Sequence, residues 1–211
     1  GRSAARFIIL NFSFFIRSMF RLFVERPMSA SDAAPWATPD ELASAAAFPP
    51  ARQAEWLSWR AIVRREVCRE FGCRPAEIAI AYNETGAPVV EGAAVHAAVS
   101  HCRGSVAVGL SDAPCAVDIE SLDRNFGRIA SRYMTPAEQA LSDDPRWPAV
   151  VWSAKETLYK YAGRKELDLL CDLRVEQADF SAGRLVGRIR GGEVLLLGFL
   201  FFAGRVIVFL S

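Results

Sequence analysis

The chain has 211 residues, of which 52% are apolar and 23% are charged. This composition is typical of a globular protein with a sizeable core and excludes a disordered segment as the default. The net charge of +1 and the two histidines give no support to nucleic-acid binding, which needs a clustered basic surface. Five cysteines without CxxC spacing speak against a disulfide framework and a zinc site, and favour free thiols in a reducing cytoplasm.

The first 27 residues are basic and apolar, with five arginines against one glutamate. Their apolar stretch from Phe7 to Ile16 is about ten residues, short of the roughly 20 needed to span a bilayer. Three interpretations compete: an amphipathic membrane-surface segment, a remnant of a targeting sequence, and non-native residues upstream of a true start at Met28. We favour the last, and expect residues 1–37 to be a disordered or non-native extension and the membrane not to be a partner.

Two helices are expected next. Thr38, Pro39 and Glu41 have the pattern of an N-cap, a first helical position and a capping box. Residues 52–72 then carry an apolar stripe and end at Gly72, a typical stop signal. The other face of this long helix carries five arginines, which are interpreted either as a solvated charged face with glutamate partners or as binding residues: Arg52, Arg60, Arg64, Arg65 and Arg69.

Short apolar runs separated by Gly, Pro, Asn and Asp predict strands at 78–82, 95–100, 105–110 and 116–120. A helical pattern returns over 124–164, broken at Thr135-Pro136 and around 143–148. The last forty residues predict three or four strands, the final two buried on both faces. This order predicts an α+β fold of two related lobes, 38–117 and 118–211.

The strand AVDIE places Asp118 and Glu120 on one side and Val117 and Ile119 on the other. Two carboxylates beside apolar strands favour a divalent cation, and hard oxygen ligands favour Mg²⁺. A surface-facing pair is the alternative.

The strand AVSHC delivers Ser100 and His101 to a turn. Adjacent strand residues point to opposite faces and no GxSxG elbow is present, so a nucleophile and base pair is disfavoured. Two interpretations remain: Ser100 and His101 donate hydrogen bonds to an anion, or His101 is a purely structural residue at a strand end.

The stretch VWSAKETLYKY, residues 151–161, predicts a helix with an apolar stripe and a second face of charges and aromatics. Periodicity alone shows only that these charges cluster.

Taken together, SHCRGSVAVGLS, AVDIE and WSAKETLYKYAGRKEL, in this order and spacing, resemble the surfactin-synthetase-activating class of 4′-phosphopantetheinyl transferases. The similarity extends over about residues 40–170 and is particularly close to the enterobactin-type members in Ser100-His101-Cys102 and in Trp152 to Glu156. It implies a pseudo-twofold monomer of two lobes, with the active site in the cleft between them.

The resemblance also implies a reaction, in which the phosphopantetheine arm of coenzyme A moves to a serine of an apo acyl or peptidyl carrier protein, releasing adenosine 3′,5′-bisphosphate. The implied Mg²⁺ ligands are Asp118, Glu120 and Glu156. Glu156 is also the implied base, with Asp118 and Lys160 as further catalytic residues. The implied coenzyme A contacts are Arg52, Arg60, Ser100, His101, Lys155 and Lys160.

Two parts of the resemblance are less complete. NETGAPVV matches the family's NxxGKP turn, but Ala87 stands where the family has a phosphate-contacting lysine. The expected carrier interface is 162–180, where Leu167, Leu169 and Leu170 suit either a carrier helix or the core.

Two other functions remain in consideration: a catalytically silent module that binds coenzyme A or a carrier protein, and a Mg²⁺-dependent phosphohydrolase built on the same carboxylates. The sequence does not identify the carrier protein.

Overall fold

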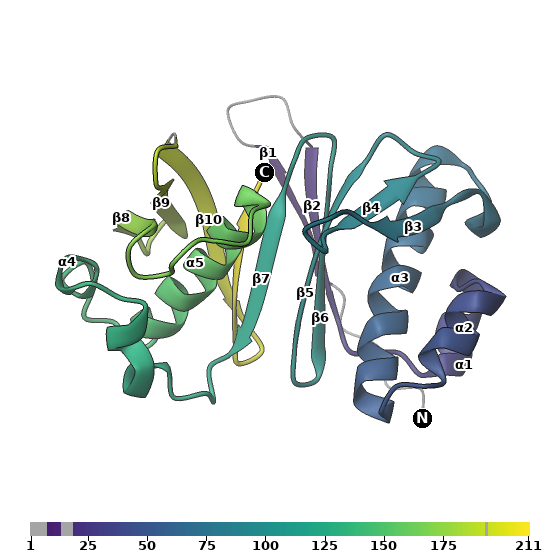
Figure 1. Cartoon of the computed structure of the whole chain (residues 1–211), viewed down its shortest axis with the longest axis horizontal. Helices are drawn as coiled ribbons and strands as arrows, with labels where there is room; N and C mark the ends of the chain where they lie inside the picture. The colour runs from purple at the N-terminus through teal and green to yellow at the C-terminus, as the bar shows by residue number, and fades with distance from the viewer. Residues whose placement is uncertain (1–7, 14–18, 193) are drawn as a thin grey trace. The chain divides into compact units, whose positions relative to one another are not determined.

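The computed structural model describes residues 8–13, 19–192 and 194–211. The chain divides into two compact units, Gly1–Pro114 and Cys115–Ser211, and most of their helices and strands are labelled in Figure 1. The division lies close to the expected boundary at 117/118. Helix and strand are both abundant and every strand pair described is antiparallel, so the fold is of the α+β class.

The first unit contains a four-stranded sheet in the order β1-β2-β6-β5. Its strands are β1 (Ile8–Ser13), β2 (Met19–Glu25), β5 (His96–Cys102) and β6 (Ser105–Ser111). The long helix α3 (Pro50–Phe71) packs against β6 and β5. Its buried stripe contributes Trp59, Ile62, Val63 and Val67 to the core of this unit. The helix ends at Gly72 in the left-handed conformation, φ 67°, as the sequence predicts.

Smaller elements complete the first unit. They are α1 (Ala30–Ala33), the 3-10 helix η1 (Ala34–Trp36), α2 (Pro39–Ala45), the 3-10 helix η2 (Pro75–Glu77), β3 (Ala79–Tyr82) and β4 (Pro88–Glu91). The helices α1 and α2 pack on α3 around a second small core. The predicted capping box is confirmed, because the Thr38 hydroxyl accepts from the backbone of Glu41 and the Glu41 carboxylate accepts from the backbone of Thr38.

The expectation of a disordered extension over residues 1–37 is wrong for β1, α1 and η1, and above all for Met19–Glu25. This segment is strand β2, which pairs with β6 from Arg21 opposite Leu110 to Glu25 opposite Val106. Phe20, Leu22 and Phe23 are at most 2% exposed. These apolar side chains of β2 are therefore core residues of a sheet. Residues 1–7 and 14–18 of the expected extension lie outside the described part.

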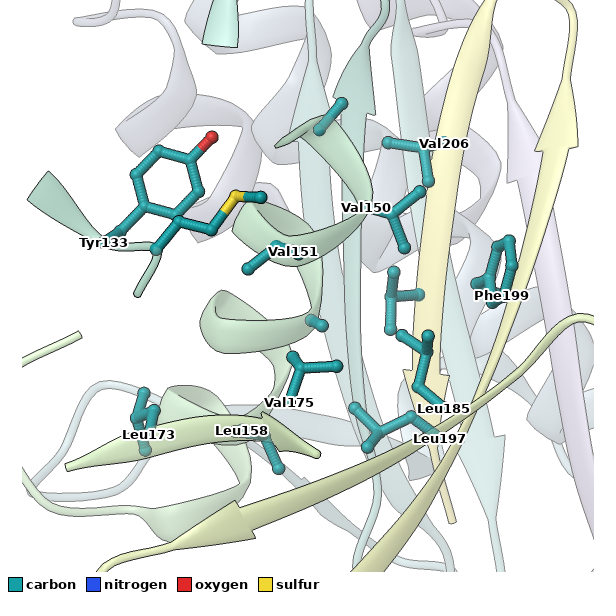
Figure 2. Close-up of a cluster of buried hydrophobic side chains, with 14 of the residues drawn as sticks. Tyr133, Val150, Val151, Leu158, Leu173, Val175, Leu185, Leu197, Phe199 and Val206 are labelled. Atoms are coloured by element: carbon teal, nitrogen blue, oxygen red, sulfur yellow. The ribbon is translucent and has the colours of Figure 1, made fainter. Parts of the chain in front are cut away.

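The second unit contains a five-stranded sheet in the order β7-β11-β10-β9-β8. Its strands are β7 (Ala116–Ser121), β8 (Leu173–Asp179), β9 (Arg184–Ile189), β10 (Val194–Phe202) and β11 (Arg205–Leu210). The helix α5 (Trp147–Ala162) packs on this sheet, mainly against β7 and β11. Figure 2 shows side chains of α5 pointing toward the strands, with Val150 and Leu158 among Val206, Leu197 and Val175.

The segment between β7 and α5 holds the 3-10 helix η3 (Phe126–Arg132) and the short helix α4 (Pro136–Gln139). The predicted breaks near Thr135 and before Pro148 are confirmed.

The expected burial of the last two strands on both faces is confirmed for β11 from Val206 to Leu210, but wrong for β10. Leu196 on β10 is 65% exposed, because this end of the strand is covered by protein on one face only.

Among the described residues, no helix is long and apolar enough to cross a bilayer. All five cysteines lie in the described part, and none of them forms a disulfide there. Cys73 donates a hydrogen bond to Cys68 with 3.2 Å between the sulfurs.

Candidate functional site

Strand β7 presents two carboxylates toward helix α5. Asp118 is 5% exposed and Glu120 is half-buried. Asp118 accepts a hydrogen bond from Ser153 and Glu120 accepts one from Trp152, both of them on α5. The two carboxylates therefore share the helix-facing side of the strand, as the alternation predicts.

Glu156, one turn further along α5, brings a third carboxylate to the same place. Burial raises the pKa of Glu156, and the negative charge of Asp118 raises it further, while Lys160 and Arg124 oppose the shift only in part. Burial also raises the pKa of Glu120, followed by repulsion from Asp118 and, more weakly, from Glu156. The three carboxylates thus lie close enough to repel one another, and their full ionisation calls for added positive charge.

Two cations supply part of that charge. Lys160 Nζ lies 2.8 Å from Asp118 Oδ1 and 3.1 Å from the carbonyl oxygen of Val117. Arg124 Nη1 lies 3.1 Å from Glu120 Oε1. The Lys160 side chain is 33% exposed, so its ammonium can leave Asp118 for another anion without being drawn out of a core.

The donor set fits Mg²⁺ in its chemistry, because carboxylate oxygens are the ligands that this ion takes from proteins. Burial and the neighbouring charge of Asp118 raise the pKa of Glu120 and of Glu156, which favours a cation here. In the part of the chain that the structure describes, however, no group of three or more His, Cys, Asp or Glu residues is already arranged to hold a metal ion. Lys160 occupies Asp118 Oδ1 instead, and Mg²⁺ stays a proposal.

The sequence-based assignment of Lys155 to phosphate is contradicted by its burial. Its side chain is fully buried, and Nζ lies 2.8 Å from Glu138 Oε1, 3.0 Å from Glu138 Oε2 and 2.9 Å from the carbonyl oxygen of Leu169. Glu138 also accepts hydrogen bonds from the backbone of Thr135 and of Val175. Lys155 is therefore a structural cation that joins α5 to α4, β8 and the segment before β8.

A hollow of about 370 Å³ opens within the second unit beside Arg124. It is lined by Leu122, Asp123, Arg124, Asn125, Phe126, Gly127, Pro145, Arg146, Pro148 and Ala149. Arg124 also stacks its guanidinium over the ring of Trp152, 5.0 Å from the ring centroid. One side chain thus joins this hollow to the carboxylate Glu120.

In the first unit, the structure brings together a histidine and a residue of helix α3. His101 at the end of β5 is exposed, and its Nδ1 lies 3.2 Å from Glu55 Oε2. Arg52, one turn before Glu55 on α3, is also exposed, with its guanidinium over the Phe48 ring. Ser100 is 8% exposed whereas its neighbour His101 is open to solvent, as expected for adjacent strand residues. Arg52 and His101 are accessible to an anion.

Arg60 does not fit the expected contact with coenzyme A. It is 3% exposed, and its guanidinium carbon lies 3.4 Å from the ring centroid of Trp56 and 4.0 Å from that of Trp59. Arg60 donates to the Tyr82 hydroxyl at 3.0 Å and pairs with Glu41 at 3.2 Å. Burial lowers the pKa of Arg60, and these partners offset the shift only in part. An arginine enclosed by three aromatic rings stabilises the unit and is closed to a nucleotide.

The interpretation of the α3 arginines as a solvated face is also wrong for Arg64. This side chain is 2% exposed, and its two terminal nitrogens lie 2.6 and 2.9 Å from the Glu41 carboxylate. Its Nε donates to the carbonyl oxygen of Ile78. Arg65 pairs with Glu25 of β2 and with Glu66. Only Arg52 and Arg69 of the five are exposed.

The NETGAP turn forms as the sequence predicts. The Asn83 side chain accepts hydrogen bonds from the backbone of Thr85 and of Ala87, and Gly86 has φ 87°. Ala87 provides no side-chain donor at this turn.

Sequence reasoning missed four residues that the structure adds to the second unit: Trp152, Ser153, Arg124 and Glu138. A signal was available for Ser153, which is a polar residue on the apolar side of α5. The Thr135-to-Glu138 spacing of a capping box was a second signal.

The comparison with known families selects the same part of the chain. Residues 114–195 match the 4′-phosphopantetheinyl transferase superfamily. The match begins just before β7 and includes α5, so it contains all three carboxylates together with Lys155 and Lys160. It supports a transferase of phosphopantetheine in general terms. Among curated proteins, no match was found.

Proposed function

We propose that this protein transfers the 4′-phosphopantetheine arm of coenzyme A to a serine of an apo acyl or peptidyl carrier protein, in a Mg²⁺-dependent reaction that releases adenosine 3′,5′-bisphosphate. The observation that carries the proposal is the position of Asp118, Glu120 and Glu156 inside the segment that matches the superfamily, with Asp118 and Glu120 hydrogen-bonded to the helix α5 that carries Glu156. We further propose the surfactin-synthetase-activating subtype, acting as a cytoplasmic monomer of two related lobes. In support, each unit packs one long helix on an antiparallel sheet.

In the proposed reaction, the serine oxygen of the carrier forms a bond to the phosphorus of the pantetheine phosphate. The bond from that phosphorus to the bridging oxygen breaks, and its electrons leave with adenosine 3′,5′-bisphosphate. A Mg²⁺ ion held by Asp118, Glu120 and Glu156 would neutralise charge on the pyrophosphate. The chain itself must accept the proton that the serine loses.

Glu156 is the proposed base. Its carboxylate lies on α5 beside the β7 carboxylates and is proposed to accept the serine proton directly or through a water. Lys160, which pairs with Asp118 and is partly exposed, would turn to a phosphate oxygen of coenzyme A. Phosphoryl transfer depends mainly on such positioning and charge neutralisation.

The nucleotide end of coenzyme A is assigned to Arg52, Ser100 and His101 of the first unit. Arg52 and His101 are exposed, and a guanidinium suits a terminal phosphate. Arg60 and Lys155 are left out of this assignment because both are buried on other partners. The carrier is expected at residues 162–180, where Leu167 and Leu169 also pack against the core of the unit.

One incubation tests the proposal. The protein is mixed with coenzyme A, Mg²⁺ and a panel of apo carrier proteins, and the carrier mass is measured. A gain equal to the phosphopantetheine arm supports transfer. Binding of coenzyme A without any gain across the panel would instead indicate a silent binding module, and release of phosphate without a carrier would indicate a phosphohydrolase.

Two variants test the site. Asp118→Ala is expected to lower transfer by orders of magnitude, and unchanged turnover would contradict the metal assignment. Asp123→Ala is the matched control, because Asp123 is an exposed carboxylate shortly after the same strand. Glu156→Gln is expected to keep coenzyme A binding while transfer is lost; if binding is lost as well, Glu156 acts mainly as a ligand.

A further inference from the structure

We propose that Ser153 is a positioning residue for Asp118: its hydroxyl holds one carboxylate oxygen and thereby leaves the other for the cation of the site. The inference rests on the proposed function, because it assigns a role toward the proposed Mg²⁺ ligand. The motif resemblance gave Ser153 no function, and the role follows from the contacts of this helix.

The two oxygens of Asp118 have different partners. The Ser153 hydroxyl lies 2.7 Å from Oδ2, and Lys160 Nζ lies 2.8 Å from Oδ1. An ionised carboxylate can only accept, so the hydroxyl must donate its proton to Oδ2. Lys160 is partly exposed whereas Ser153 is fully buried. Of these two partners, Lys160 on Oδ1 is therefore the more readily exchanged, and Ser153 on Oδ2 is the more firmly held.

The hydrogen bond of Ser153 is unusual for a serine inside a helix. Such hydroxyls commonly donate to the carbonyl oxygen four residues earlier, and Thr157 of the same helix does so, with 2.8 Å between its Oγ1 and the Ser153 carbonyl oxygen. Ser153 donates across to strand β7 instead. Both hydroxyls are fully buried, but only that of Ser153 contacts a carboxylate of the proposed site.

The contact sets the direction of the carboxylate. Asp118 is almost fully buried on a central part of β7, and the bond to Ser153 fixes the rotation of its carboxylate group. Removal of a group that holds a metal ligand in this way typically lowers the metal affinity about 10-fold to 100-fold. Without the hydroxyl, Asp118 is free to turn both oxygens toward Lys160.

The test compares Ser153→Ala with Thr157→Val, which removes a buried hydroxyl one turn later without touching Asp118. Binding of Mn²⁺ is measured by electron paramagnetic resonance, and transfer is measured against Mg²⁺ concentration. For Ser153→Ala we expect Mn²⁺ affinity to fall about tenfold or more, and the Mg²⁺ concentration for half-maximal transfer to rise equally. Thr157→Val should match the wild type in both measurements.

A third variant keeps the hydroxyl. Ser153→Thr is expected to bind Mn²⁺ within a few-fold of the wild type, with all three variants compared well below their melting temperatures. Wild-type affinity in Ser153→Ala, or equal weakening in Ser153→Ala and Thr157→Val, would overturn the positioning role while leaving transfer by the wild type intact. Absence of both Mn²⁺ binding and transfer in the wild type would overturn the proposed function and this inference together.

Discussion

Lys155 and Glu138 form a fully buried ion pair in the second unit, with 2.8 Å between Nζ and Oε1. The two residues lie on different helices. Glu138 is the last residue of the capping box of α4, and Lys155 lies in the middle of α5. Glu138 also accepts a hydrogen bond from the backbone of Val175 on β8. This pair joins three elements around the core and explains why a lysine sits on the apolar side of the helix.

Replacement of Lys155 is therefore expected to act on stability. Lys155→Met leaves Glu138 buried without its cation, and such a loss costs about 3 to 5 kcal/mol of unfolding free energy. Urea unfolding of Lys155→Met and of the wild type measures this loss of unfolding free energy. Adding Glu138→Gln to the same chain should restore part of the loss, because the buried negative charge is then removed.

Lys160→Met is the matched control for this prediction. Its ammonium is partly exposed, so Lys160→Met should cost less stability than Lys155→Met even though Asp118 loses a cation, while transfer should fall more than about tenfold as a phosphate contact is lost. If Lys155→Met left stability unchanged and weakened coenzyme A binding, Lys155 would contact phosphate and its structural role would be wrong.

Strand β2 provides the second prediction. Leu22→Ala and Phe23→Ala remove side chains that are at most 2% exposed, and such truncations cost about 2 to 5 kcal/mol. Met19→Ala on the same strand removes a side chain that is 64% exposed and should cost less than about 0.5 kcal/mol. Chemical denaturation of the three variants distinguishes a folded strand from a dispensable extension, since an extension would give three equal curves.

Glu41 provides a prediction about acid stability. Burial alone would raise the pKa of Glu41, but hydrogen bonds from Arg64 and from the backbone of Thr38, with the charges of Arg64 and Arg60, lower it below its ordinary value of 4.5. A carboxyl whose folded pKa is lowered stabilises the fold above its unfolded pKa, and this stabilisation is lost as the pH falls through the folded pKa.

Glu41→Gln should therefore cost about 1.5 to 3 kcal/mol near neutral pH, as a charge-assisted network is lost. The difference in unfolding free energy between Glu41→Gln and the wild type should narrow as the pH falls from about 5 to about 3. Urea unfolding across this range measures this difference, with Glu84→Gln, an exposed glutamate, as the control. A difference that stays constant with pH would show that Glu41 acts through shape rather than through charge.

The sequence predicts local structure well where residues close together in the chain determine it. The capping box at Thr38, the stop at Gly72 and the alternation along β7 depend on backbone geometry that neighbouring residues set, and the structure contains all three. The roles of Lys155 and Arg60 could not be predicted in this way. Each depends on a partner from another element, Glu138 or Glu41, and the spacing of a motif does not report burial.

The same limit explains the error at the N-terminus. An apolar and basic segment is equally typical of a membrane-surface anchor and of a strand whose arginine reaches a neighbouring helix. Arg21 of β2 in fact pairs with Glu70 of α3, a contact between residues far apart in the chain. The pairing of β2 with β6 shows that residues 19–25 form a strand, and no local pattern in these residues contains that information.

The last prediction separates the two arginines of α3 that were both assigned to coenzyme A. Arg52 is exposed and Arg60 is enclosed by Trp56, Trp59 and Tyr82. Arg60→Ala removes these contacts and the partner of Glu41, so it should cost about 2 to 4 kcal/mol of unfolding free energy. Arg52→Ala should leave stability within about 0.5 kcal/mol of the wild type and weaken coenzyme A binding about tenfold, as expected when a guanidinium contact to phosphate is lost.

Calorimetric titration with coenzyme A and with its 3′-dephospho form distinguishes these roles. Arg52→Ala should bind the two forms almost equally, because the group that Arg52 is proposed to recognise is present in only one of them. Arg60→Ala, measured below its melting temperature, should keep the preference of the wild type for the 3′-phosphate. Loss of that preference in Arg60→Ala alone would place Arg60 at the nucleotide despite its burial, and the aromatic enclosure would then have to open when coenzyme A binds.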